Sequence, residues 1–181
     1  MVLIIIICTL ALLSIILFGV MLSTSKKQKK NIIRIETAEE EIDKSLNERQ
    51  KLLIEMENII NKNTEVSQNN FKDIDKENLS YFELDKKLSK IADTFSKIKS
   101  DYQIELDTED FRKLTTELKM NEEKNEASKK YYNKYAENLN KQINKFPSNI
   151  FAKITKQSEK RIFDITNMKF NKNDIVFESE I

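Results

Sequence analysis

Residues 130–152, KYYNKYAENLNKQINKFPSNIFA, contain a helix and the point at which that helix must end. Apolar side chains recur there at alternating steps of four and three residues, which places them on one stripe of a helix. They are Tyr132, Ala136, Leu139, Ile143 and Phe146. Pro147, the only proline, lacks a backbone donor and disfavours the α conformation for Phe146, so the helix stops there. Ser148 or Asn149 is well suited to cap a further helix.

Two asparagines, Asn133 and Asn140, lie seven residues apart, one position beside this stripe. Side-chain amides at such positions can form hydrogen bonds across helices and fix their register. We therefore interpret the pair as structural. The block at 146–149 is interpreted as a helix-breaking corner rather than as a peptide ligand.

This stretch resembles the signature of the LemA family, a near-repeat of Tyr-Asn followed by Phe-Pro-Ser-Asn. The matching residues are Tyr132, Asn133, Asn140, Phe146, Pro147, Ser148 and Asn149. Leu139 replaces the second tyrosine, and Ile54-Glu55 replaces a Pro-Asn pair usual in the first helix, so the chain is identified as a divergent member. The resemblance implies a helical bundle on a membrane anchor, and it implies no established reaction.

Composition excludes most kinds of enzyme site. The chain has no histidine, which removes the commonest general base and metal ligand. Its only cysteine, Cys8, and its only glycine, Gly19, lie in the apolar segment, so the remainder offers no cysteine-based zinc site and no glycine-rich phosphate loop. We expect no catalytic, cofactor-binding or metal-binding residues and no small-molecule substrate. A hydrolase that uses carboxylates is the alternative left open.

Residues 2–22 form an unbroken apolar run of about 21 residues, long enough at ~1.5 Å per residue to cross a ~30 Å hydrocarbon core. A cleaved signal peptide would have basic residues before the run and small residues at a cleavage point after it. The residues that follow, at 21–25, contain no Ala-x-Ala pattern. We predict an uncleaved transmembrane anchor over 1–24, in contact with membrane lipids.

Four lysines follow the run immediately, and no charged side chain precedes it: Lys26, Lys27, Lys29 and Lys30. Positively charged flanks remain in the cytoplasm, so the prediction is an outside amino terminus and a cytoplasmic domain over 25–167 at the cell membrane. The lysines also suit anionic headgroups, although a topology signal alone is the favoured interpretation. An extracytoplasmic domain behind a signal anchor is the alternative.

The remaining sequence predicts an all-α fold, an antiparallel up-and-down bundle of three long helices and a shorter fourth. The first, near 32–60, has the stripe Ile35, Ala38, Ile42, Leu46, Leu53, Met56 and Ile60. The second is expected over 77–99, with Ser80 as an alternative start, and the third over 109–146, capped by Thr108. A weaker helix after the corner would include Ile162, Phe163 and Ile165, and residues 168–181 are predicted to be a mobile tail.

Charged residues interrupt two of these stripes. Arg49 stands at a core position of the first helix, and Glu122, Asn125 and Lys129 stand at core positions of the third. An unpaired buried guanidinium is too costly to keep. We therefore hypothesise a structural ion pair between Arg49 and Glu122.

Tyrosines and lysines alternate at 129–135, a pattern that can bind single-stranded nucleic acid by stacking. Tyr132 lies on the core stripe, however, and the net charge is only +1, so no nucleic acid is expected. The sequence predicts a membrane-tethered, non-catalytic interaction or scaffold module. Its unknown protein partner would bind an outer helix face or one end of the bundle.

Overall fold

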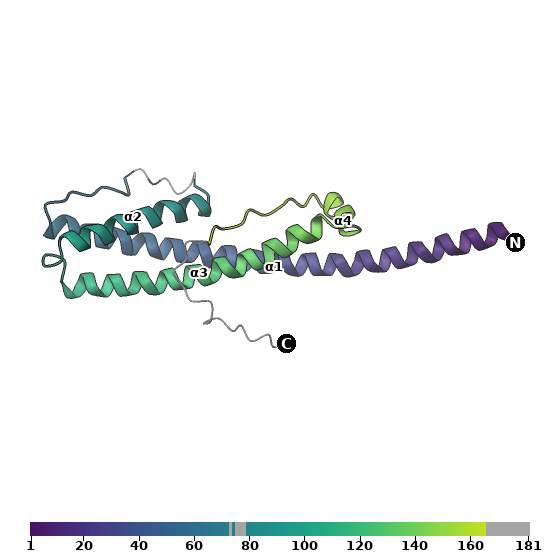
Figure 1. The fold of residues 1–181 in the computed structure, drawn as a ribbon, viewed down its shortest axis with the longest axis horizontal. Coiled ribbons are helices and arrows are strands. Elements are labelled where there is room, and N and C mark those ends of the chain that lie inside the picture. Colours follow the sequence, from purple (N-terminus) through teal and green to yellow (C-terminus); the bar gives the residue numbers. More distant parts are fainter. Residues whose placement is uncertain (73, 75–78, 166–181) are drawn as a thin grey trace.

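The computed structural model describes residues 1–72, 74 and 79–165. Those residues form four helices and no strand: α1 (Val2–Asn63), α2 (Tyr81–Asp101), α3 (Glu109–Ile143) and α4 (Ser148–Ile154). The helices α1 and α3 lie side by side, α2 packs on α1, and α4 packs against the end of α3 and against α1 (Figure 1). The prediction of an all-helical protein with a long apolar amino-terminal helix and a helical bundle is confirmed.

Helix α1 contains both the apolar run and the first helix of the bundle in 62 unbroken residues. No proline or glycine occurs between Val20 and Asn63, so the sequence contains nothing that would end it. It is long and apolar enough to cross a membrane, with a window of mean hydropathy 3.1 that is not buried within the protein. At ~1.5 Å per residue its length is roughly 90 Å. The bundle therefore begins as a direct continuation of the apolar segment (Figure 1).

The apolar stripes form the core. All seven residues of the predicted α1 stripe are buried, from Ile35 to Ile60. On α2 the buried residues are Leu84, Leu88, Ile91, Phe95 and Ile98. Because α2 has 21 residues and α3 has 35, α2 covers only part of the α1–α3 pair. The chain that follows α4 runs along the rest (Figure 1).

Capping residues set the starts of α2 and α3. Ser80 accepts a hydrogen bond from the Glu83 backbone N–H, and the Glu83 carboxylate accepts one from the Ser80 backbone N–H. The Ser80 hydroxyl, which donates to the Glu83 carboxylate at 2.8 Å, and after it the Ser80 backbone N–H lower the pKa of Glu83. The predicted start of the second helix at residue 77 is therefore wrong, and the alternative start at Ser80 is correct. Thr108 caps α3 through the Phe111 N–H, as predicted.

The carboxyl end of α3 differs from the prediction. The helix ends at Ile143 rather than at Phe146. The Lys145 N–H bonds to the Gln142 carbonyl, and the Asn144 side chain bonds to the Asn140 carbonyl. A backbone bond that spans three residues and a side-chain bond thus take the place of the last helical turn before Pro147.

The part of the chain after the corner is less helical than predicted. Helix α4 is only seven residues long, and Pro147 is its N-cap, so the prediction that Ser148 or Asn149 caps it is wrong. Residues 157–165, which we call the return segment, are not helical, contrary to the prediction for Ile162, Phe163 and Ile165. Their backbone groups bond to α3 side chains instead, as described below. The predicted tail at 168–181 lies outside the described residues.

Candidate functional site

A buried ionic network joins the three long helices. Arg49 on α1 and Glu122 on α3, predicted to pair, lie 2.6 Å apart between Nη2 and Oε1. Asp85 on α2 lies 3.6 Å from Arg49 Nη1 and 2.6 Å from Lys129 Nζ. It also accepts a hydrogen bond of 3.1 Å from Asn125 Nδ2. The side chains of Arg49, Asp85 and Lys129 are only 7%, 15% and 9% exposed.

The network balances two cations with two carboxylates. Glu122 is partly exposed, at 38%, but the other three charges are removed from water and are tolerated only when they are paired. Arg49, Asp85 and Lys129 therefore fix one another's positions. Sequence reasoning missed Asp85. Lys129 occupies a core position of α3, and a buried lysine needs an acidic partner. Its position in the sequence therefore indicated that an acid of another helix lies opposite it.

Two asparagines of α3 hold the backbone of the return segment. Asn133 Nδ2 donates to the Phe163 carbonyl at 2.8 Å, and its Oδ1 accepts from the Phe163 N–H at 2.9 Å. Asn140 makes the same two bonds with the backbone of Lys160, both at 2.8 Å. Asn133 and Asn140 lie seven residues apart on a helix, a rise of ~10.5 Å. Lys160 and Phe163 lie three residues apart in an extended segment, a span of ~10 Å, so the spacing of the asparagines matches that of their backbone partners. The prediction that these amides bond across helices is wrong, because their partner is this non-helical segment.

Aromatic packing completes the attachment. Phe163 is 5% exposed, and its ring lies 4.1 Å from that of Phe82 and 5.3 Å from that of Tyr132, between centroids. The Tyr132 hydroxyl donates to the Arg161 carbonyl at 2.9 Å. The return segment thus covers the part of α3 that α2 does not reach.

The Tyr81 side chain packs against Phe163, and its ionisation should make the stability of the protein depend on pH. Burial, and after it the hydrogen bond to Glu39, raises the pKa of Tyr81 above its ordinary value. Above about pH 10 the unfolded chain loses this proton while the folded protein keeps it, so stability falls as pH rises further. The stability difference between the natural protein and Tyr81→Phe should be constant from pH 7 to 9 and shrink from about pH 10. Urea unfolding across this range tests it, and a difference unchanged at pH 11 would contradict it.

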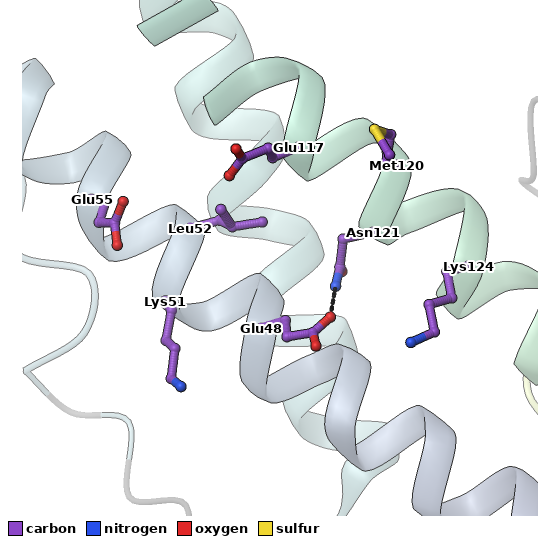
Figure 2. A pocket seen from close by; sticks show the side chains of 8 residues that line it. All are labelled: Glu48, Lys51, Leu52, Glu55, Glu117, Met120, Asn121 and Lys124. Atoms are coloured by element: carbon purple, nitrogen blue, oxygen red, sulfur yellow. Dashed lines mark hydrogen bonds between the residues drawn. The ribbon is translucent and has the colours of Figure 1, made fainter. Parts of the chain in front are cut away.

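Three hollows lie along the contact between α1 and α3, and we call them together the groove. Its central part has a volume of 460 Å³ and is shown in Figure 2. Its lining residues are Glu48, Lys51, Leu52, Glu55, Glu117, Met120, Asn121 and Lys124. Leu52 projects between the two helices, and Met120 on the opposite wall is 64% exposed. Glu48 accepts a hydrogen bond of 3.3 Å from Asn121 across the groove (Figure 2).

Two further hollows lie along the same pair of helices. One of 320 Å³ shares Glu55 and Glu117 with the central part and extends to Ile59 and Asp110. The other, of 220 Å³, lies between Thr37 and Tyr131. The lining residues of all three come from α1 and α3. On α1 they extend from Thr37 to Ile59, roughly 33 Å, which is the length of a helix of about 20 residues.

In the comparison with known proteins, the model of the LemA family matches residues 37–177. The chain belongs to the LemA family. No curated protein and no solved structure matches it. The matched range of this LemA protein contains the ionic network, both asparagines and the groove.

The FPSN residues of the LemA signature form the corner between α3 and α4. Phe146 is 69% exposed, whereas Ser148 is 8% exposed. The Asn149 N–H donates to the Lys145 carbonyl at 2.8 Å across the corner. The block thus reverses the chain and directs it into α4 and the return segment.

The tyrosines at 131–135 of the LemA chain do not form one exposed aromatic surface. Tyr132 and Tyr135 are 1% and 8% exposed. Arg34 of α1 lies 4.6 Å above the Tyr135 ring and donates to its hydroxyl. Lys129 belongs to the ionic network. These groups are used within the bundle.

The acidic side chains give little support to the carboxylate-based alternative. Burial raises the pKa of Glu126, and the neighbouring Lys130 and Lys129 oppose this shift. Glu122, which also raises it, is itself paired with Arg49. A pair of free acids is therefore not formed there. Across the ranges that the structure describes, no group of three His, Cys, Asp or Glu side chains is placed to hold a metal ion.

Proposed function

We propose that this LemA protein is a membrane-tethered, non-catalytic interaction module that binds a helix of a partner protein in the α1–α3 groove. The continuity of α1 carries the proposal, because one helix is both the apolar segment and a wall of the groove. Counted from Leu22, the groove would lie roughly 20–55 Å above the end of the apolar run. A partner at the same membrane would meet it at a constant height.

The lining of the groove indicates the chemistry of the partner. Helix-in-groove recognition needs an apolar stripe on the incoming helix, and Leu52 and Met120 provide the matching surface. Three carboxylates and two lysines surround them, and Lys124 is itself bound to Glu41 at 3.4 Å. The excess of acid favours an amphipathic helix whose apolar stripe is flanked by lysine or arginine.

The orientation in the membrane is part of the proposal. The four lysines at 26–30 favour a cytoplasmic bundle and an outside amino terminus. A reporter fused after Ile181 that is active only in the cytoplasm would test this. Activity of a reporter specific to the outer compartment would favour the extracytoplasmic alternative.

Site-specific photo-cross-linking in intact cells tests the groove. A photoreactive residue placed at Lys51 of the full chain should give one partner adduct, mapping to a basic amphipathic helix. Met120→Glu should remove the adduct, because it places a charge on the apolar wall. Ile33→Glu is the matched control, since Ile33 is 62% exposed, close to the 64% of Met120, and does not line the groove.

Three results would contradict the proposed partner. An adduct that survives Met120→Glu would place the contact outside the groove. Equal loss in Ile33→Glu would show a general effect of added charge. An adduct with a second copy of this chain would replace the partner protein by self-association.

A further inference from the structure

Helix α4 exposes an apolar face at the end of the bundle nearest to the apolar run (Figure 1). Ile150 and Ile154 lie one turn apart and are 46% and 67% exposed, and Phe146 just before them is 69% exposed. Ser148 and Ala152, on the other side, are buried. The helix is therefore amphipathic, and its apolar face is not covered by the bundle.

The position of α4 along α1 can be read from contacts. Gln28 of α1 is fully buried, and Met21, Thr24 and Ser25 are half-buried, so the bundle covers α1 down to the end of the apolar run. Asn31 bonds to Gln142 near the end of α3, and the chain then continues toward the apolar run into α4, which packs on α1. If residues 2–22 span a hydrocarbon core, α4 lies at the height of the headgroup layer, which is ~5–8 Å thick on each side.

Seven lysines lie in or next to the segments at this end of the bundle. Four follow the apolar run on α1, and three more lie beside or within α4: Lys145, Lys153 and Lys156. Amphipathic helices with exposed apolar residues and flanking lysines bind at the boundary between the headgroups and acyl chains of anionic bilayers. Charge and height thus both match a lipid surface.

We infer that α4 is a second membrane contact, with Phe146, Ile150 and Ile154 inserted into the interface of an anionic bilayer. The inference rests on the proposed anchoring by residues 2–22. Two contacts at different distances from the axis of α1 restrain the tilt of this helix relative to the bilayer. The α1–α3 groove is then held at a constant height above the membrane.

The absence of tryptophan from the chain makes a direct test available. Three full-length variants, Ile154→Trp, Ile104→Trp and Phe18→Trp, are reconstituted separately into vesicles of phosphatidylcholine and phosphatidylglycerol that contain brominated lipids. Ile104 is 89% exposed in the α2–α3 connection, at the opposite end of the bundle, and serves as the matched control. Phe18 lies within the apolar run and reports on anchoring.

We expect lipid bromination near the headgroups to quench the fluorescence of Ile154→Trp severalfold more than that of Ile104→Trp, with Phe18→Trp quenched by deeper bromination. If Phe18→Trp is quenched but Ile154→Trp behaves like Ile104→Trp, the anchor stands and the α4 contact is wrong. If Phe18→Trp is not quenched, the anchoring fails, and this inference fails with it.

Discussion

Replacement of Asp85 by asparagine is expected to destabilise the bundle by about 3–5 kcal/mol, because it leaves buried cations without their acid. Arg49 would retain Glu122, but Lys129, whose side chain is 9% exposed, would keep no ion-pair partner and would face amides and the Phe163 ring. A loss of this size is a large share of the ~5–15 kcal/mol that stabilises a typical domain. Urea unfolding of the full-length protein in detergent, followed by circular dichroism, measures it.

Asp93→Asn is the matched control for this prediction. Asp93 lies on the same helix and is exposed. Its substitution should change the unfolding free energy by less than about 0.5 kcal/mol. If Asp85→Asn and Asp93→Asn unfold at the same urea concentration, Arg49 and Lys129 are solvated in the folded protein as well as in the unfolded chain. The network would then not hold the three helices together.

Asn133→Asp should destabilise the protein by about 2–3 kcal/mol and release the return segment. The change keeps the shape of the side chain and the acceptor for the Phe163 N–H. It replaces the donor to the Phe163 carbonyl by a carboxylate oxygen, so that two acceptors face each other in a buried position. Hydrogen exchange at the amides of Lys160 and Phe163 should accelerate in this variant.

The control is Asn138→Asp on the same helix, at an exposed position. It adds the same charge and should leave both the exchange rates and the unfolding free energy nearly unchanged. Exchange of the Phe163 amide as slow in Asn133→Asp as in the natural protein would contradict the prediction, because the segment would then stay attached without the bond to the Phe163 carbonyl.

The long helices were predictable because their signal is local. The α1 stripe from Ile35 to Ile60 repeats with helical spacing, and all of it is buried. Arg49 and Glu122 were recognisable because each breaks such a stripe. Asp85 was not, because it lies between Leu84 and Leu88 like any outer charge of an amphipathic helix. Only the packing of α2 against Lys129 distinguishes it.

The return segment was not predictable from its own residues. The spacing of Ile162, Phe163 and Ile165 permits a helix. What decides against one is the pair of amides on α3, which satisfies the backbone of Lys160 and Phe163 from 20 and 30 residues away. The asparagines were correctly singled out, but the sequence did not indicate what they bind.

The groove follows from a weaker pattern. Leu52 and Ile59 line it and lie seven residues apart on α1, beside the core stripe. Two apolar residues next to a stripe do not show whether they are covered, because that depends on how far apart two helices pack. The sequence therefore predicted only that a partner would use an outer face or an end of the bundle.

In the proposed function, α1 acts as one rigid connection between the membrane and the groove. A flexible linker of about 12 Gly and Ser residues inserted after Ser25 keeps the anchor and the buried residues, which begin at Gln28, but breaks this connection. With the photoreactive residue at Lys51, the yield of the partner adduct should fall severalfold, whereas the same linker inserted after Ile104 should leave it unchanged. An undiminished yield after the Ser25 insertion would contradict the account.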